Sequence, residues 1–186
     1  MQIQMQMPCA MSISFRPIQE GSRDFLLSLL EAAFPPEERR TRQDTLRVLD
    51  ESNDFHPQAI YSDEKRIGIL TYWSFPDFYY IEHLAILPEL RGSGYGKEAL
   101  HQFKQLTAGL PIILEVEPPE NRIAERRIAF YQSCGYHLSD EFYEQPPYTK
   151  KGTPIPLRIM SSPDPIAHEF FLAFCKSTRA TVYKTV

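Results

Sequence analysis

A glycine-rich turn, Arg91-Gly92-Ser93-Gly94-Tyr95-Gly96, lies between an extended apolar run over residues 80–87 and a helical pattern over residues 97–106. Glycine lets backbone N–H groups approach an anion closely, and the N-terminus of the following helix directs a partial positive charge to the same place. The segment therefore predicts a strand–loop–helix unit that binds a phosphate or a pyrophosphate.

Other phosphate-binding loops require particular surroundings. A dinucleotide-binding loop belongs to a βαβ repeat, with an acidic residue about twenty positions after its glycines. The loop of a nucleoside triphosphatase ends in Gly-Lys-Ser or Gly-Lys-Thr. Here Lys97 is followed by Glu98, which does not fit that second pattern.

The turn resembles the acetyl-CoA-binding loop of the GNAT acetyltransferase superfamily, whose pattern Arg/Gln-x-x-Gly-x-Gly/Ala corresponds here to Arg91, Gly94 and Gly96. Residues 84–88, Leu-Ala-Ile-Leu-Pro, look like the family's fourth strand and its exit into the loop. The resemblance extends over residues 13–160. It implies the GNAT fold and transfer of an acetyl group from acetyl-CoA to an amine. The segments Glu-Val-Glu-Pro-Pro (115–119) and Gln-Pro-Pro-Tyr (145–148) look like features of a bacterial subgroup.

Length and composition limit the class of protein. The 186 residues, 42% hydrophobic and 24% charged, are typical of one soluble globular domain. A net charge of −4 argues against a nucleic-acid partner. Three widely separated cysteines support neither a disulfide framework nor a zinc site, which predicts a cytoplasmic protein with no metal. The first eleven residues resemble neither a signal peptide nor a membrane anchor, so no membrane association is expected.

The periodicity and the resemblance together predict an α/β (α+β) domain with the GNAT acyl-CoA N-acyltransferase fold. This fold is a mixed, mostly antiparallel sheet of six to seven strands flanked by helices. Strands are expected at 13–17, 58–62, 66–74, 78–87, 112–117 and 154–160, and helices at 25–33, 41–51, 97–106 and 121–133.

We divide the chain into a leader or edge strand (1–12), a GNAT acetyltransferase domain (13–162) and a C-terminal helix and tail (163–186). Asp164 and Pro165 look like the N-cap and the first residue of the final helix. The apolar stripe of that helix is expected either to pack onto its own domain or to form a homodimer contact.

The resemblance assigns the co-substrate to the fourth strand and the glycine-rich turn. Backbone N–H groups of Leu84 and Ile86, where family members have a bulged strand, are expected to contact the acetyl carbonyl and the pantetheine arm. The amides of residues 92–96 are expected to bind the pyrophosphate, with Lys97 adding charge at the rim. The expected acetyl-CoA-binding residues are Leu84, Ala85, Ile86, Arg91, Gly92, Ser93, Gly94, Tyr95, Gly96 and Lys97.

Tyr131 lies in a segment, Phe-Tyr-Gln-Ser-Cys-Gly-Tyr (130–136), that looks like the family segment whose tyrosine donates a proton to the CoA sulfur. Its alternative role is packing, because it continues the apolar stripe of Ala124 and Ile128. Family members commonly have an asparagine seven residues before this tyrosine. Ala124 occupies that position here, and Asn121 is one turn too early.

Glu82 is the candidate general base for the substrate ammonium, acting directly or through water. Regular strand alternation places it on one face with Tyr80 and Leu84, and places His83 on the opposite face. The alternative is that Glu82 belongs to a structural ion pair. His83 ranks second as a base.

The acceptor is expected near the splayed ends of the fourth and fifth strands, with Glu115, Glu117, Tyr80 and Tyr148 as candidate substrate residues. Alternatively, the two glutamates pair with Arg122 and Arg126, members of an otherwise solvated helix face.

We expect an acetyl-CoA-dependent N-acetyltransferase that acts on a small-molecule amine or a peptide by direct attack in a ternary complex. A non-catalytic acyl-CoA-binding or regulatory module is the alternative.

Overall fold

The computed structural model describes residues 12–184, so the predicted leader or edge strand lies outside the described residues except for Ser12. The strands are β1 (Ile13–Pro17), β2 (Phe55–Ser62), β3 (Lys65–Ser74), β4 (Tyr79–Ile86), β5 (Ile112–Val116), β6 (His137–Leu138), β7 (Tyr143–Gln145) and β8 (Ile155–Ser162). The α-helices are α1 (Arg23–Ala33), α2 (Arg42–Glu51), α3 (Tyr95–Leu106), α4 (Arg122–Ser133) and α5 (His168–Thr181), with short 3-10 turns at Glu20–Ser22, Pro36–Glu38 and Pro88–Leu90.

The strands form one sheet in the order β1-β2-β3-β4-β5-β8-β6, and β7 pairs with β8 beside this path. Among the strands of residues 12–184, β4 and β5 run parallel and the other pairs are antiparallel. This arrangement confirms the predicted mixed, mostly antiparallel α/β fold. The sheet has eight strands rather than six to seven. The extra strands are two or three residues long, too short for a periodic pattern to reveal them.

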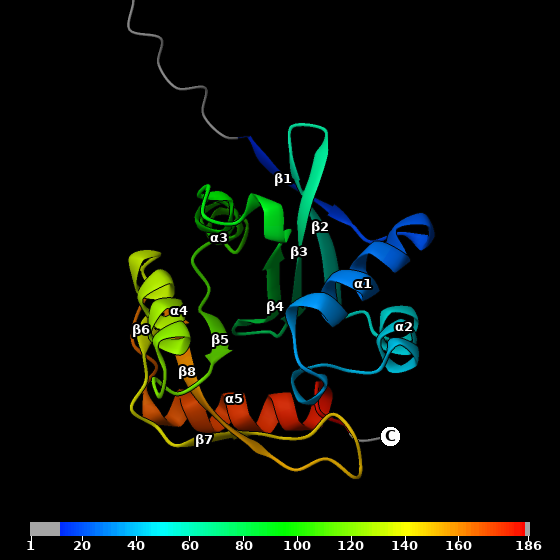
Figure 1. The fold of residues 1–186 in the computed structure, drawn as a ribbon. Coiled ribbons are helices and arrows are strands. Elements are labelled where there is room, and N and C mark those ends of the chain that lie inside the picture. Colours follow the sequence, from blue (N-terminus) through cyan, green and yellow to red (C-terminus); the bar gives the residue numbers. More distant parts are fainter. Residues whose placement is uncertain (1–11, 185–186) are drawn as a thin grey trace, which may run out of the picture.

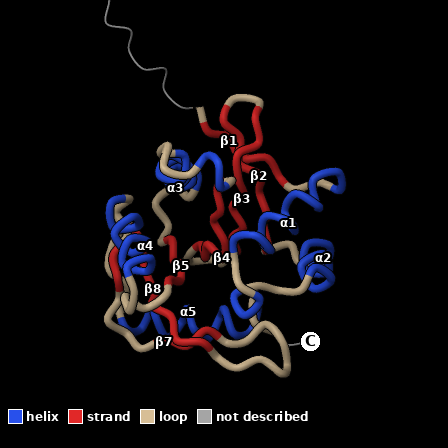
Figure 2. Tube along the Cα trace, viewed as in Figure 1, coloured by secondary structure: helices blue, strands red, loops and turns tan. Residues whose placement is uncertain are grey.

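Helices cover the sheet in separate layers (Figure 1, Figure 2). On one side α3 and α4 bury Phe103 and Ile128 against the strands, and on the other side α1 buries Leu26 and Leu30. The hydrophobic stripe of each helix thus faces the sheet, as the 3.6-residue period requires. Local capping fits the same plan, because the Thr41 side chain accepts a hydrogen bond from the backbone N–H of Asp44 at the start of α2.

Helix α5 packs against its own domain, which is one of the two alternatives expected for it. Phe171 and Phe174 are buried in a cluster with strand residues such as Ile113 and Ile159. The predicted start of the helix was wrong, since the N-cap is Ala167 rather than Asp164. The carbonyl of Asp164 instead accepts a hydrogen bond of 2.8 Å from the Ser161 hydroxyl, which holds residues 163–164 in a bend.

A β-bulge interrupts β4 next to the cleft. Thr71 of β3 pairs with His83 and Tyr72 pairs with Ile81, so Glu82 is an extra residue without a partner on β3. An inserted residue reverses the alternation of the strand beyond it. Tyr80 consequently packs in the α5 cluster while Leu84 packs in the α3 and α4 cluster.

The predicted alternation along β4 was therefore wrong in two respects. Tyr80 and Leu84 do not share a face. His83 is not opposite Glu82, because its Nδ1 lies 3.9 Å from Glu82 Oε2. The physical reason is the extra residue, which a strictly alternating pattern does not include.

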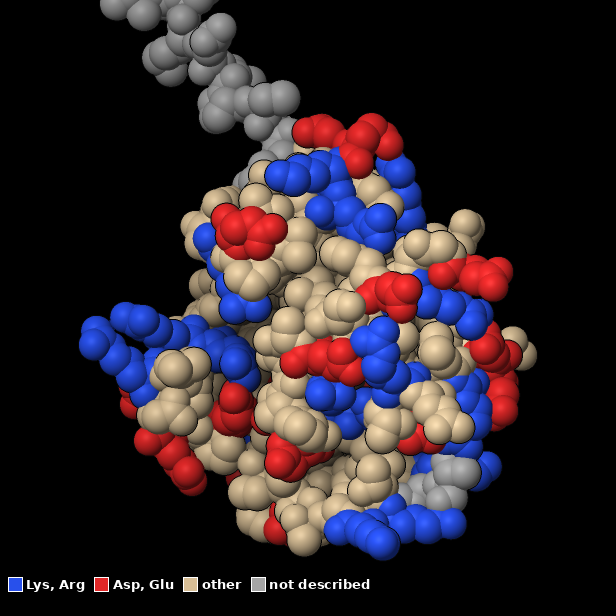
Figure 3. All heavy atoms as spheres, turned by 45° about the vertical axis from the view of Figure 1, so that its right-hand side comes forward, with Lys and Arg blue, Asp and Glu red and all other residues tan. Residues whose placement is uncertain are grey.

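The surface carries both signs of charge. Figure 3 shows acidic and basic side chains interspersed over most of the face drawn. Among residues 12–184, none of the helices combines the length and the apolar composition needed to cross a membrane.

Gly68 provides a test of the β3–β4 contact. A Cβ at this position would lie 2.3 Å from the carbonyl oxygen of Ala85, whereas a Cβ at Gly21 would meet nothing within 4 Å. Gly68→Ala should lower the free energy of unfolding by about 1–3 kcal/mol, as overpacking does, while Gly21→Ala should change it by less than about 0.5 kcal/mol. Urea denaturation measures both values. Equal midpoints for the two variants would contradict the close approach.

Candidate functional site

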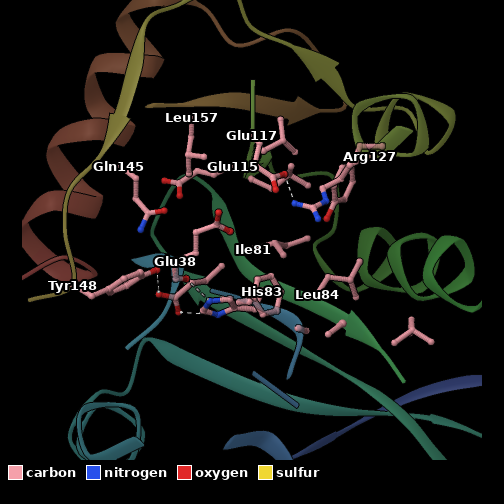
Figure 4. Close-up of a pocket in the computed structure, with 18 of the residues that line it drawn as sticks. Glu38, Ile81, His83, Leu84, Glu115, Glu117, Arg127, Gln145, Tyr148 and Leu157 are labelled. Atoms are coloured by element: carbon pink, nitrogen blue, oxygen red, sulfur yellow. Dashed lines mark hydrogen bonds and ion pairs between the residues drawn. The ribbon is translucent and has the colours of Figure 1, made fainter. Parts of the chain in front are cut away.

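The site begins where β4 and β5 separate. The two strands pair only over Tyr79–Ile81 and Ile112–Leu114, and they diverge beyond these residues. A cavity of about 310 Å³ opens between them (Figure 4). Its lining includes the candidate residues Glu82, His83, Leu84, Ala85, Ile86, Arg91, Glu115, Glu117, Tyr131 and Tyr148. The fold therefore brings most of the predicted site residues to one place.

At one end of the cavity the glycine-rich turn leads into α3. Gly92 and Gly94 have φ angles of 80° and 86°, a left-handed conformation that favours glycine. Gly94 is the N-cap of α3 and offers no side-chain acceptor to the N–H groups of the first turn. Residues 91–94 are exposed. These exposed amides precede the N-terminus of α3 and form a cradle of the kind that binds anionic phosphate groups.

Two contacts hold the cradle in position. The Nε of Arg91 donates a 3.1 Å hydrogen bond to the carbonyl of Ile86, which ties the turn to the end of β4. Gly96 lies close to α4, since a Cβ there would approach the Phe130 ring to 3.3 Å. The last glycine of the motif therefore serves close helix packing. Lys97 is exposed at the rim.

Helix α4 carries Tyr131 into the cavity. Asn121 caps this helix, because its side chain accepts 3.0 Å hydrogen bonds from the N–H groups of Ile123 and Ala124. Burial raises the pKa of Tyr131 to about 12, with nearby Arg127 opposing the shift. Tyr131 is thus a protonated phenol at neutral pH. It also packs edge-on against Tyr136, so the packing role and the cavity position coexist.

Glu82 is held by a buried network. Its Oε1 accepts hydrogen bonds of 2.5 Å from Arg40 and 2.8 Å from the Tyr148 hydroxyl. Its Oε2 accepts a 3.0 Å hydrogen bond from the indole N–H of Trp73. The side chains of Arg40 and Glu82 are only 6% and 0% exposed. Burial alone would raise the pKa of Glu82, but the charge of Arg40 and the hydrogen bonds lower it overall.

His83 is also fully engaged. Its Nδ1 lies 3.1 Å from the Thr71 hydroxyl and its Nε2 lies 3.0 Å from the carbonyl oxygen of Glu38. A carbonyl can only accept, so Nε2 carries the proton and Nδ1 accepts from the threonine. Burial lowers the pKa of His83, which keeps the ring neutral. Both nitrogens are occupied by structural partners.

Glu115 of β5 is surrounded by hydroxyl groups. Tyr143 donates a hydrogen bond to its Oε1, and the Tyr183 hydroxyl lies 2.9 and 3.0 Å from its two oxygens. The Tyr183 hydroxyl also lies 2.8 Å from that of Tyr80. Burial raises the pKa of Glu115 to about 7, although hydrogen bonds from the three tyrosines oppose the shift. This carboxyl group therefore exchanges a proton near neutral pH.

The rim of the cavity contains further acidic groups. Glu117 forms an ion pair with Arg127, whereas Arg122 and Arg126, the partners considered from the sequence, are exposed. Glu38 faces the same space, and its pKa is raised by burial and by the charge of Glu117. Arg127, on the same helix, thus lines the cavity while its side chain stays partly exposed.

Four residues that shape this cavity were assigned no site role in the sequence analysis. Arg40 and Trp73 bind Glu82, and Tyr143 and Tyr183 bind Glu115. Alternation of Tyr143 with Gln145 is a weak signal for a strand facing the cleft. Tyr183 follows the final helix, and no local sequence pattern indicates that it lies at this site.

The sequence profile of the Acetyltransferase (GNAT) family matches residues 23–136. The chain belongs to this family. YjbC of Bacillus subtilis (strain 168), provisionally named an acetyltransferase, is 30% identical over 105 residues. The match covers 55% of this chain and 52% of YjbC, so the similarity spans about half of that relative.

Solved structures share the fold. A Bacteroides thetaiotaomicron protein, provisionally named a GNAT-family acetyltransferase, is 36% identical with a TM-score of 0.86, covering 93% of this chain and 99% of that one. Arabidopsis thaliana Naa50, solved with the bisubstrate analogue CoA-Ac-MVNAL, is 18% identical with a TM-score of 0.59. Its match covers 81% of this chain and 98% of Naa50, and at this identity it shows the common fold alone.

Removal of one partner of the Glu82 network tests its structural importance. Arg40→Met leaves a buried carboxylate without its cation and should lower the free energy of unfolding by about 3–5 kcal/mol. Arg16→Met breaks the exposed Arg16–Glu64 pair, whose side chains are 45% and 87% exposed, and should cost about 1 kcal/mol or less.

The effect of Arg40→Met should also depend on pH. The lowered pKa of Glu82 gives stability that is present above the unfolded pKa and is lost as the pH falls through the folded pKa. The difference between wild type and Arg40→Met should therefore shrink on acidification. Denaturation curves from pH 7 down to about pH 3 measure it, because the loss begins only below the ordinary carboxyl pKa of 4.5. An equal cost for both arginine variants would contradict the network.

Proposed function

We propose that the protein is an acetyl-CoA-dependent N-acetyltransferase that modifies a small primary amine in a ternary complex. One observation carries the proposal: the cavity between β4 and β5 contains the titratable Glu115 and Tyr131 and extends to Arg91 at the phosphate cradle. A site of this shape holds a long phosphorylated thioester and an amine side by side, and such juxtaposition supplies much of the rate acceleration.

Backbone groups bind the co-substrate in this proposal. The N–H groups of Leu84 and Ile86 lie on the part of β4 that has no β5 partner, and they contact the acetyl carbonyl and the pantetheine arm. The amides of residues 92–96 bind the pyrophosphate, and Lys97 adds positive charge. When bound, acetyl-CoA supplies an activated acetyl group as a thioester.

Glu115 is the residue that we propose to accept the proton of the substrate ammonium. A carboxyl group whose pKa is about 7 is suited to proton transfer at neutral pH. Glu82, the base expected from the sequence, has a lowered pKa because Arg40 forms a buried ion pair with its carboxylate. Its role in the proposal is to position Tyr148 and the cleft wall.

The proposed reaction moves the acetyl group from the CoA sulfur to the amine nitrogen. The ammonium loses one proton to Glu115, and the resulting amine nitrogen forms a bond to the acetyl carbon while the carbon–sulfur bond breaks. The nitrogen then releases its second proton to solvent, which leaves a neutral amide. Tyr131 gives a proton to the departing sulfur, which leaves as the CoA thiol. Tyr131 recovers a proton from solvent, and Glu115 loses its proton to solvent.

A small amine is favoured over a peptide because an aromatic wall closes one side of the cavity. The Tyr148 ring lies 4.8 Å from the Arg40 guanidinium and 5.1 Å from the Tyr183 ring. Its hydroxyl is fixed by Glu82.

The free thiols of Cys134 and Cys175 are consistent with a reducing, cytoplasmic location.

The phosphate cradle can be tested with a matched pair of glycine variants. Gly94 and Gly109 have nearly the same left-handed φ, 86° and 85°, but Gly109 follows α3 rather than preceding it. An L-residue in this conformation costs about 1–2 kcal/mol. Gly94→Ala should therefore weaken CoA binding by about 10-fold or more in calorimetry, and Gly109→Ala should change it by less than about twofold. A similar loss in both variants would assign the effect to general strain.

The proton-transfer roles predict distinct kinetics. In wild type, kcat/KM for an amine should rise as the pH rises through about 7, because Glu115 must be ionised. Glu115→Gln should lose about 10²- to 10⁴-fold in rate together with this titration, and Tyr131→Phe should lower kcat by a similar factor. Tyr61→Phe removes a hydroxyl outside the cavity and is the control.

Thiol release with a panel of amines measures these rates. Unchanged rates in Glu115→Gln and Tyr131→Phe would remove both assignments. Binding of CoA without thiol release for any amine would favour a non-catalytic acyl-CoA-binding module.

A further inference from the structure

Gln145 has an unused hydrogen-bonding group in the cavity. The residue is 2% exposed, and within residues 12–184 its Nε2 has no hydrogen-bond partner. Figure 4 shows its side chain pointing from the strand into the cavity, beside Leu157 and across from Glu115. A buried donor without an acceptor costs about 1–3 kcal/mol, so an unpaired group of this kind requires an explanation, and a bound ligand that accepts its hydrogen bond is one.

The strand register determines where the Gln145 amide lies. Tyr143 and Gln145 are buried on the same face of β7, while Glu144 between them is exposed. The Tyr143 hydroxyl binds Glu115, the proposed proton acceptor. Two residues of strand advance the chain by about 7 Å, which brings Gln145 toward Tyr148. The amide therefore lies a short distance along the cavity from the position of the reacting amine.

The charges around Gln145 select what it can bind. Glu117 and Glu82 are each paired with an arginine, whereas within the described residues neither Glu38 nor Glu115 forms an ion pair. A substrate carboxylate next to these two acidic groups would be repelled. A neutral carbonyl would accept from Nε2 without this repulsion. A neutral amide offers in addition an N–H group for Gln145 Oε1.

We propose that Gln145 recognises a neutral carboxamide on the acceptor, so that the preferred substrate is an amine that also carries an amide group. This inference rests on the proposed function and names the substrate class of the same site. Plain alkylamines leave the Gln145 amide unsatisfied, and amino acids place a carboxylate near Glu38 and Glu115. Both classes are therefore disfavoured.

Three acceptors of matched shape test the proposal: β-alaninamide, its apolar isostere 3-methylbutylamine, and β-alanine. Calorimetry with saturating CoA gives their dissociation constants, and thiol release at pH 8 gives kcat/KM. The dissociation constant of β-alaninamide for wild type should be at least about 10-fold lower than that of 3-methylbutylamine. β-Alanine should bind more weakly than either. The order in kcat/KM should be the same.

Gln145→Met keeps an unbranched side chain of similar length but cannot form these hydrogen bonds. It should lose the preference for β-alaninamide while it retains or improves binding of 3-methylbutylamine. Retention of the apolar acceptor is the internal control for folding. Gln105→Met, on the exposed face of α3, should leave the preference unchanged.

The outcomes separate the two hypotheses. Turnover of amines without a preference for β-alaninamide, or the same preference in Gln145→Met, would overturn the role of Gln145 and leave the acetyltransferase proposal intact. Absence of thiol release with every amine would overturn the proposed function. In that case the role of Gln145 would be decided by the binding constants alone. Equal affinities for β-alaninamide and 3-methylbutylamine would overturn that role.

Discussion

The buried ion pair between Arg40 and Glu82 connects the parts of the structure that form the cleft. Arg40 precedes α2, Glu82 is the extra residue of the β4 bulge, and a second guanidinium nitrogen of Arg40 donates a 2.7 Å hydrogen bond to the carbonyl of Val182 beyond α5. Trp73 and Tyr148 complete the shell around the carboxylate. Two desolvated charges are tolerated only when every partner is in place, so the cleft wall, the bulge and the C-terminal segment are interdependent.

The same cavity contains two glutamates with opposite properties. Arg40 and the hydrogen bonds lower the pKa of Glu82, whereas burial without a cation raises the pKa of Glu115 to about 7. Their surroundings therefore shift the pKa values of the two carboxyl groups in opposite directions, as suits a structural anion and a proton acceptor. Divergent pKa values of neighbouring carboxyl groups are a general means of dividing such roles. Tyr183, which binds Glu115, links this division to α5.

Much of the fold was predictable because its signals are local. The glycine-rich turn, the Thr41 cap and the helical stripes depend on neighbouring residues, and the structure contains the corresponding loop, cap and helices. The short strands β6 and β7 and the start of α5 were not predictable in this way. The two strands depend on pairing with β8, which joins segments that are not adjacent in the sequence. At the start of α5, the Ser161 hydroxyl binds the carbonyl of Asp164, and the helix begins later than the sequence suggested.

The sequence by itself determined the family, the glycine-rich turn before α3, and acidic and aromatic residues near the ends of β4 and β5. Only the tertiary structure decided which carboxyl pKa is lowered and which is raised. Alternation along β4 favoured Glu82, but the bulge directs that side chain to Arg40 and Tyr148. A pKa depends on the charges and hydrogen bonds that surround a group in space. The partners of Glu82 and Glu115 come from segments as distant as Arg40 and Tyr183, so only the folded chain brings them together.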